Sequence, residues 1–259
     1  TDSQFQLRLA TRLKADGTAE IFERLPDGAW TPFTEVPIGD IDGFRLIDFS
    51  ADGATLYLID ARGRDKAALF ALDMKTRESK LLAADDEADI VQAVLDEERR
   101  PVAACANRDR ARWYAVEPGA RQDLADLARH GAGDVNILSE SADRRIVSVF
   151  YERDNESGEF ALLDRERREV RKLLVERKAL ANVALRKMQP VIIPSRDGLR
   201  LNGYLTLPAP DAAGGRMPLV LVIHGGPYAR DVWGFNSIHQ WLASRGCAGL
   251  RVHHGGPRG

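Results

Sequence analysis

Residues 218–227 read Pro-Leu-Val-Leu-Val-Ile-His-Gly-Gly-Pro, an uninterrupted apolar run that ends in a glycine-rich turn. A run of this kind is typical of a strand buried on both faces inside a parallel sheet. Gly225 and Gly226 allow the backbone to turn sharply and leave its N–H groups uncovered at the carboxyl end of the strand. Ligands bind at that edge in open α/β sheets. The stretch therefore predicts an α/β domain with a binding edge at residues 224–227.

The residues before this stretch predict a hairpin. The sequence pattern changes near Met188. Beyond it, two strand-like runs, 191–194 and 199–207, flank Ser195-Arg196-Asp197-Gly198. An Asp-Gly pair between two such runs is a turn signal. Residues 208–218 are rich in Ala, Gly and Pro and predict a surface loop that leads to the apolar strand.

The residues after the glycine turn predict a helix and a second parallel strand. The helix spans residues 236–245, and Gly246 is its natural C-cap. Its apolar face is expected to contain Ile238, Trp241 and Leu242. Residues 247–252 form another short apolar run. Strand, helix and strand in this order indicate a βαβ crossover with parallel pairing.

The first two thirds of the sequence contain a repeat. Apolar or aromatic runs end in an acid at Asp73, Glu117 and Asp164, about 44 and 47 residues apart, and Ile21-Phe22-Glu23 is a degenerate first copy. A period of 40 to 50 residues filled by four short strands is typical of β-propeller blades. A sandwich of meandering strands is the alternative. Residues 123–130 depart from the pattern and predict a helical turn where a strand is expected.

These patterns predict a mainly β plus α/β fold in two domains. Residues 1–186 are expected to form a partial β-propeller of about four blades, and residues 187–259 an α/β domain. An incomplete ring of blades leaves sheet edges exposed. We therefore expect that two copies of the chain could pair through these edges as a homo-oligomer.

Composition excludes several classes of function. The 37 basic and 39 acidic residues nearly balance, and no basic stripe is interleaved with aromatic residues, so no nucleic-acid partner is expected. No apolar stretch approaches the roughly 20 residues of a membrane helix. No signal peptide is visible, which favours a cytoplasmic location. The two cysteines, Cys105 and Cys247, lie far apart in apolar neighbourhoods and are expected to be free thiols.

The histidines do not predict a metal site or a cofactor site. His253 and His254 are adjacent on a predicted strand, where neighbouring side chains point to opposite faces. No cysteine or acid stands at a useful spacing from them. His224 is expected to order the turn through a hydrogen bond to the backbone. We therefore predict neither a metal nor a cofactor.

A set of specific motifs lies within residues 188–254. They are Ser195-Arg196-Asp197-Gly198, Asn202-Gly203-Tyr204-Leu205, Pro208, His224-Gly225-Gly226-Pro227, Trp233-Gly234, Gln240-Trp241-Leu242-Ala243 and Arg245-Gly246. Through these motifs the second part of the sequence resembles the prolyl oligopeptidase family of serine peptidases, in particular its acylaminoacyl-peptidase and dipeptidyl-peptidase-like branch. The resemblance implies a β-propeller that caps an α/β-hydrolase domain and admits short peptides to a Ser-Asp-His triad. It implies that residues 187–259 are the beginning of that hydrolase domain.

The resemblance carries few site residues onto this chain. No Gly-x-Ser-x-Gly nucleophile motif occurs in the sequence, and the family's triad lies beyond the matched region. We therefore expect the 259-residue chain to be inactive by itself. The backbone N–H of Gly226 is implied as an oxyanion-hole donor, and Tyr228 is expected to line the substrate pocket. Residues 253–259 depart from the family pattern.

The resemblance implies a peptidase that releases aminoacyl or acyl-aminoacyl groups from short peptides through an acyl-enzyme. Two alternatives stay open at this point. An esterase or lipase shares the hydrolase fold and the oxyanion turn, although lipases rarely carry a propeller. A non-enzymatic propeller that binds other proteins is the alternative from another class.

Overall fold

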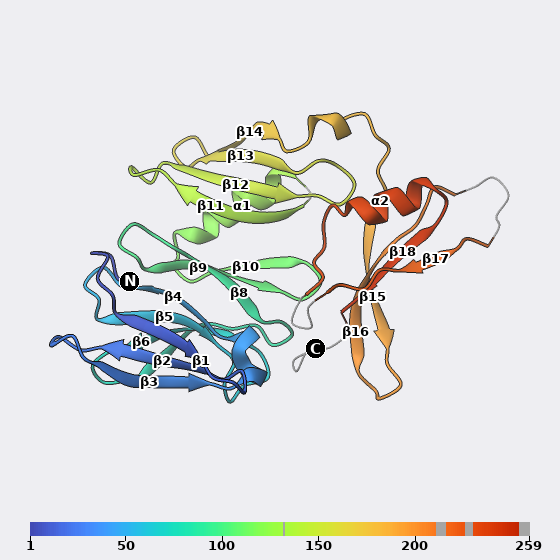
Figure 1. The fold of residues 1–259 in the computed structure, drawn as a ribbon. Helices are drawn as coiled ribbons and strands as arrows, with labels where there is room; N and C mark the ends of the chain where they lie inside the picture. Colours follow the sequence, from blue (N-terminus) through green and yellow to red (C-terminus); the bar gives the residue numbers. More distant parts are fainter. Residues whose placement is uncertain (132, 211–215, 226–229, 254–259) are drawn as a thin grey trace. The chain divides into compact units, whose positions relative to one another are not determined.

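The computed structural model describes residues 1–131, 133–210, 216–225 and 230–253. These residues divide into two compact units (Figure 1). The first contains Thr1–Arg108 and Arg112–Arg121, and the second contains Asp109–Ala111 and the chain from Gln122 onward. None of the helices within the described ranges has the length and apolar content that a membrane crossing requires.

The first part of the chain forms three antiparallel sheets, each a meander of consecutive strands. The sheets are built from β1 (Leu9–Leu13), β2 (Ala19–Arg24) and β3 (Trp30–Val36); β4 (Arg45–Phe49), β5 (Thr55–Asp60), β6 (Ala68–Asp73) and β7 (Ser79–Ala83); and β8 (Ile90–Leu95), β9 (Pro101–Asn107) and β10 (Ala111–Ala115). A short 3-10 helix, Ile38–Gly43, joins the first sheet to the second.

A fourth antiparallel meander belongs to the second unit. It contains β11 (Asp134–Glu140), β12 (Ile146–Glu152), β13 (Glu159–Asp164) and β14 (Glu169–Val175). The predicted four strands per repeat are correct for this sheet and for β4–β7. They are wrong for β1–β3 and β8–β10, which have three strands within the described residues. After β10 the chain forms α1 (Ala120–His130), which confirms the predicted helical departure at residues 123–130.

The two four-stranded sheets share a turn of the same construction. Ser50 with Asp52, and Ser141 with Asp143, occupy the first hairpin turn of their sheets. Each serine hydroxyl donates to the carboxylate two residues later at 2.6 Å. Each also accepts, at 2.9 Å, from the backbone N–H five residues later. Such local side-chain bonds favour turns over continued strands. The same spacing of residues therefore builds the same hairpin in both sheets.

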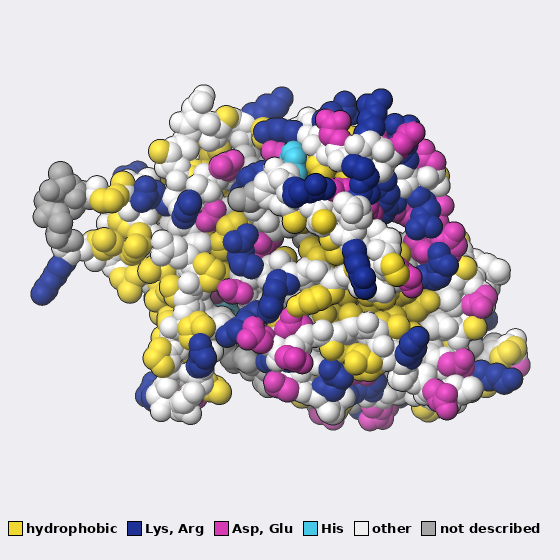
Figure 2. Space-filling view, turned by 180° about the vertical axis from the view of Figure 1, so that it is seen from behind, with side chains coloured by type: hydrophobic (Ala, Val, Ile, Leu, Met, Phe, Trp, Pro, Cys, Tyr) yellow, Lys and Arg dark blue, Asp and Glu magenta, His cyan; other side chains and the backbone are white. Residues whose placement is uncertain are grey.

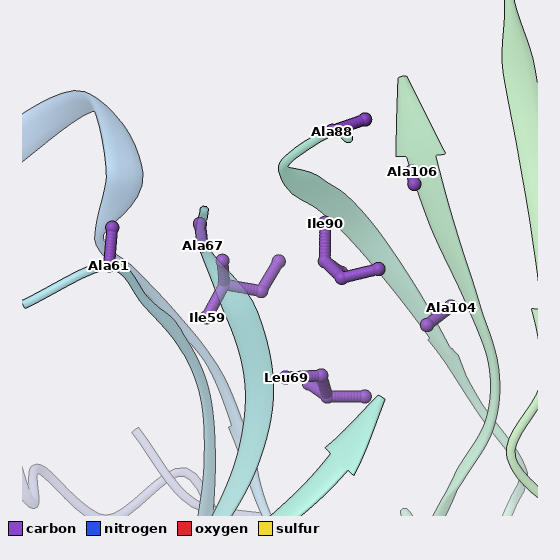
Figure 3. Packing of buried hydrophobic residues seen from close by; sticks show 8 residues of the cluster. All are labelled: Ile59, Ala61, Ala67, Leu69, Ala88, Ile90, Ala104 and Ala106. Carbon is purple, nitrogen blue, oxygen red and sulfur yellow. The ribbon is translucent and has the colours of Figure 1, made fainter. Parts of the chain in front are cut away.

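Neighbouring sheets of the first unit pack through small side chains (Figure 3). The buried cluster between β4–β7 and β8–β10 consists of Ile59, Ala61, Ala67, Leu69, Ala88, Ile90, Ala104 and Ala106. Five of these eight residues are alanines. Because alanine adds little thickness, it allows two sheets to approach closely while three larger side chains fill the space between them.

Helix α1 packs on the fourth meander. Leu127 is 1% exposed and lies in a core with Val147, Val149 and Leu163. The buried hydroxyl of Tyr151 donates to the carbonyl of Leu127 at 2.7 Å. Burial raises the pKa of Tyr151 to about 12, so the phenol stays protonated and remains a donor.

Replacing Tyr151 with phenylalanine is expected to destabilise the second unit by about 1 kcal/mol. The ring and its packing are retained, but the carbonyl of Leu127 loses its donor. Urea denaturation of the wild type and the variant gives the difference. An unchanged midpoint would show that water replaces the hydroxyl without loss.

The last part of the chain forms a mixed sheet in the order β15-β16-β18-β17. Its elements are β15 (Met188–Pro194), β16 (Arg200–Thr206), β17 (Leu219–Leu221), α2 (Ser237–Ser244) and β18 (Ala248–Val252). The 3-10 turn Lys178–Leu180 precedes it. Strands β15 and β16 form the predicted hairpin, and Gly198 adopts the positive φ of 88° that its turn requires. Strands β17 and β18 are parallel, which confirms the crossover through α2.

The structure corrects the predicted burial of the apolar strand. Strand β17 contains only three residues, and all three are exposed; the exposed fractions are 58% for Leu219 and 52% for Leu221. Ile223, just beyond the strand, is 65% exposed. The reason is that β17 pairs only with β18 and lies at the edge of the described sheet. Figure 2 shows apolar side chains at the surface on the side of the mixed sheet.

The predicted apolar face of α2 is also largely wrong. Leu242 is buried, but Ile238 is 51% and Trp241 59% exposed. The buried face instead contains His239, Leu242 and Ala243. Two adjacent faces of α2 contain apolar residues, and either face could pack against the sheet. The face with His239, Leu242 and Ala243 does so, and the face with Ile238 and Trp241 is exposed. The cap prediction is correct, because Gly246 follows the helix with a φ of 79°.

Candidate active site

The candidate site lies where β17 ends. Val222 N–H donates to the carbonyl of Leu250 at 2.8 Å, which extends the pairing with β18 by one residue. His224 is half-buried, and its Nδ1 lies 2.9 Å from the carbonyl oxygen of Gly225. Because a carbonyl oxygen only accepts, Nδ1 carries the proton and donates. This contact confirms that His224 orders the turn through a bond to the backbone.

Gly225 leaves the backbone open at this edge. A Cβ atom added to it would meet no other atom within 4 Å. The next residues of the predicted site, Gly226 and Tyr228, lie outside the described residues. Their assigned roles, as oxyanion donor and as pocket-lining residue, stay predictions. The exposed amide region at Gly225 is the part of the predicted binding edge that the described structure shows.

The carboxyl end of β18 brings a second histidine to the same edge. His253 N–H donates to the carbonyl of Asn202 at 2.8 Å, and its ring centroid lies 6.1 Å from that of His224. The predicted partner of His253, His254, lies outside the described residues. Across the described ranges, no group of three or more metal-ligating side chains comes together.

A histidine that was not predicted as a site residue lies between α2 and the mixed sheet. His239 on α2 is fully buried, and its Nδ1 lies 3.0 Å from the hydroxyl of Thr206. A Cβ atom on Gly249 of β18 would lie only 3.1 Å from the imidazole ring. Glycine at this position therefore allows α2 to seat the ring directly on the sheet. Burial, with a contribution from Arg251, lowers the pKa of His239 to about 4, although Asp231 opposes the shift.

Residues 230–236, which lead into α2, are held by three other elements. The carboxylate of Asp231 pairs with Arg251 on β18. The indole N–H of Trp233 donates to the carbonyl of Met188 at 2.8 Å. Phe235 N–H donates to the carboxylate of Glu152 at 3.0 Å. Residues 231–235 are therefore fixed to β18, β15 and β12.

Neighbouring groups also hold Trp233 and the Phe235–Glu152 contact in place. The guanidinium of Arg110 stacks 3.6 Å from the centroid of the Trp233 ring. Burial raises the pKa of Glu152, although the N–H of Phe235 partly opposes this shift. Gly234 has a φ of 143°, and a Cβ atom there would lie 2.6 Å from the Glu152 side chain. Glycine is required at this position because the carboxylate occupies the space of a side chain.

Gln240 connects α2 to the segment between the fourth meander and the mixed sheet. Its amide nitrogen donates to the carbonyls of Arg186 at 2.7 Å and Asp154 at 3.0 Å. Its amide oxygen accepts from Arg186 N–H at 2.8 Å. The carboxylate of Asp154 accepts from Met188 N–H at 2.7 Å. One side chain therefore satisfies both backbone groups of Arg186 and one of Asp154.

Replacing Gln240 with alanine is expected to cost about 2 kcal/mol of stability in the second unit. Three hydrogen bonds are lost, but the site is only half-buried, so water compensates in part. Thermal or urea unfolding measures the effect. Trp241→Ala serves as a control on the same helix, because its side chain is 59% exposed. An equal loss in both variants would show that the hydrogen bonds of Gln240 contribute little.

The glycine turn was predicted from the sequence, whereas the Asp231–Arg251 pair and His239 were not. One signal for the pair was present. Arg251 interrupts an apolar strand, and a charged residue in such a strand needs a partner. No comparable signal identified His239, because a histidine in a short helix is ordinarily placed on the polar face.

Known proteins similar to this chain include peptidases. No protein-family model matches it. Dipeptidyl aminopeptidase BIII of Pseudoxanthomonas mexicana is 36% identical over 265 residues, which cover 100% of this chain and 38% of that protein. Dipeptidyl peptidase 4 of Porphyromonas gingivalis matches with a TM-score of 0.68 and 15% identity over 94% of this chain and 36% of its own. The acylaminoacyl peptidase of Pyrococcus horikoshii matches with a TM-score of 0.58 and 18% identity over 95% and 38%.

This chain spans about two fifths of the length of the curated relative. The two solved structures, at their low identity, show a shared fold in which several antiparallel sheets match a propeller-like domain. The identity to the aminopeptidase extends over the whole chain. On this evidence, the chain is similar to part of a peptidase of the prolyl oligopeptidase family.

Proposed function

We propose that the full-length protein containing this chain is a serine-type peptidase that releases dipeptides from the amino end of short peptides. The observation that carries the proposal is the parallel β17–α2–β18 crossover with His224 and Gly225 at the carboxyl end of β17. That crossover follows four antiparallel meanders. The identity to dipeptidyl aminopeptidase BIII over the whole chain supports the choice of dipeptides.

The domain assignment is part of this proposal. The four antiparallel meanders are assigned to four blades of a propeller, and the mixed sheet to the beginning of an α/β-hydrolase domain. The propeller would limit access to short peptides. The repeated serine–aspartate turns support the first assignment. The order of strand, helix and parallel strand supports the second.

In this proposal, the reaction proceeds through an acyl-enzyme. A serine hydroxyl supplied outside residues 1–259 attacks the scissile carbonyl carbon, and a histidine takes its proton. The C–N bond then breaks, and the same histidine returns the proton to the leaving amine. Water attacks the ester in a second step of the same form and releases the dipeptide.

In the proposed reaction, this chain would help to stabilise the negative charge that develops on the carbonyl oxygen. The N–H of Gly226 and the N–H that follows the nucleophile would bind the oxyanion. One such donor contributes roughly 3–4 kcal/mol to stabilisation of the transition state. His224, with its Nδ1–H bonded to the Gly225 carbonyl, would shape the turn rather than transfer a proton. Tyr228 would line the pocket.

The test compares the full-length protein with the 259-residue chain. The full-length protein is expected to cleave a dipeptidyl p-nitroanilide faster than an acyl-aminoacyl p-nitroanilide. It is also expected to react with a fluorophosphonate probe, whereas the 259-residue chain is not. Folding of both is checked by circular dichroism.

Each alternative has its own outcome. Hydrolysis of p-nitrophenyl esters without hydrolysis of the anilides would favour the esterase reading. Preferred release of acylated amino acids would place the substrate class with the acylaminoacyl peptidases. A folded full-length protein that neither reacts with the probe nor cleaves any substrate would favour a non-enzymatic propeller. Labelling of the 259-residue chain would contradict the assignment of the nucleophile.

A further inference from the structure

Asp231 and Arg251 form a buried ion pair beside the candidate site. The side chain of Asp231 is 1% exposed and that of Arg251 15%. Arg251 Nε donates to Asp231 Oδ1 at 2.6 Å, and a terminal guanidinium nitrogen also donates to the same oxygen. The second oxygen, Oδ2, is buried without a hydrogen-bond partner among the described residues. The charge of Asp231 is therefore balanced chiefly by one residue.

The pair joins two segments that are both next to the predicted oxyanion turn. Asp231 lies seven residues after His224 in the sequence. Arg251 lies on β18, the strand that pairs with β17. His224 and Gly225 lie three and four residues after the end of β17. The pair therefore fixes residue 231, on the carboxyl-terminal side of the predicted turn, to the strand that neighbours β17.

The other contacts of this segment are of a different kind. Trp233 and Phe235 attach it to β15 and β12 through their N–H groups. Both contacts lie nearer to α2 than Asp231 does. Asp231 is the anchor nearest to the turn among the three. A buried contact between two charged groups, made through two donors, restricts both distance and direction more strongly than a contact made through a single N–H donor.

We propose that Asp231 is a positioning residue for the oxyanion turn, and that it acts through its ion pair with Arg251. The proposal rests on the proposed function, because it needs the turn to bind a developing oxyanion. Donors of an oxyanion hole act only when they lie about 2.7–3.1 Å from the charged oxygen. A displacement of about 1 Å lowers the rate by up to a hundredfold. Loss of the anchor nearest to the turn therefore lowers kcat rather than the affinity for substrate.

The test uses the full-length protein and the variant Asp231→Asn, which keeps the shape of the side chain and removes its charge. The expected result is a loss of about tenfold or more in kcat, with KM changed less than twofold. The rate constant of inactivation by a fluorophosphonate falls by a similar factor, because the phosphonyl oxygen occupies the same donors. A product dipeptide inhibits with an unchanged Ki, which a general loss of structure would not allow.

The matched control is Asp126→Asn on α1. Asp126 is also 1% exposed and also paired with arginines, Arg129 and Arg168, but it contacts none of the residues of the candidate site. This variant is expected to lose stability and to keep kcat and KM. If Asp126→Asn lowers kcat as much as Asp231→Asn does, the effect is one of stability and the proposal is overturned.

A second variant covers the case in which Asp231→Asn fails to fold. Arg251→Lys keeps the charge balance but replaces two donors from one planar group with a single point contact. It is expected to lower kcat several-fold with KM unchanged. Wild-type kcat in either folded variant overturns the proposal while the proposed function stands. An inactive wild-type protein overturns both.

Discussion

Replacing Arg251 with glutamine is expected to lower the free energy of unfolding of the second unit by about 3–5 kcal/mol. The reason is an asymmetry within the pair. Removal of Arg251 leaves the carboxylate of Asp231 buried, charged and without its counterion. An uncompensated buried charge is far more costly than the loss of an exposed ion pair, which typically contributes 0–1 kcal/mol. This variant is therefore expected to be the most destabilised of those considered.

Two further variants test whether the unpaired buried charge of Asp231 causes this loss of stability. Asp231→Asn is expected to cost less than Arg251→Gln, because Arg251 is 15% exposed and retains access to water after its partner is lost. The double variant Asp231→Asn/Arg251→Gln is expected to be more stable than Arg251→Gln alone. Urea denaturation followed by tryptophan fluorescence measures all three. A double variant that is less stable than Arg251→Gln would mean that the buried charge is not the source of the loss.

Local features of the fold were predictable from the sequence. The hairpin of β15 and β16 was predicted because an Asp-Gly pair specifies its own turn. The repeat was predicted because apolar runs that end in an acid recur at Asp73, Glu117 and Asp164. The crossover through α2 was predicted because the order of strand and helix determines parallel pairing. In each case the information lies in the order of residues and elements along the chain.

Burial was less predictable, because it depends on which elements cover a segment. The apolar run at Leu219–Leu221 indicated a strand correctly but not its exposure, which follows from its position at the edge of the described sheet. Trp241 is exposed because α2 turns its other stripe inward. Two apolar stripes on one short helix have nearly the same periodicity, so the pattern alone does not choose between them.

Part of the candidate site was beyond prediction for a related reason. Asp231 and Arg251 are twenty residues apart and meet only because the crossover returns the chain to β18. His239 is accommodated because Gly249, on a different element, leaves room for its ring. The glycine turn itself was found because it is a contiguous motif. The residues that hold its surroundings come from separate elements, and a single sequence does not show such pairings.

The stability of the second unit is expected to fall as the pH falls from about 6.5 to about 4 because of His239. Its pKa is about 4 in the folded state, and burial is the main cause. An unfolded chain has a histidine pKa near 6.5. Between these values the unfolded state binds a proton that the folded state does not, so stability rises with pH in this window. The slope is at most about 1.4 kcal/mol per pH unit, and the total is about 3 kcal/mol.

The variant His239→Gln isolates this effect from the carboxylates that titrate in the same range. Glutamine can still bond to the hydroxyl of Thr206 but carries no charge at any pH. The difference in unfolding free energy between wild type and variant is therefore expected to shrink as the pH is lowered from 7 to 4. Tyr151→Phe is the control, because its phenol has a pKa of about 12 and does not titrate in this window. A wild-type advantage that stays constant from pH 7 to pH 4 would show that the buried imidazole accepts a proton as readily as an exposed one.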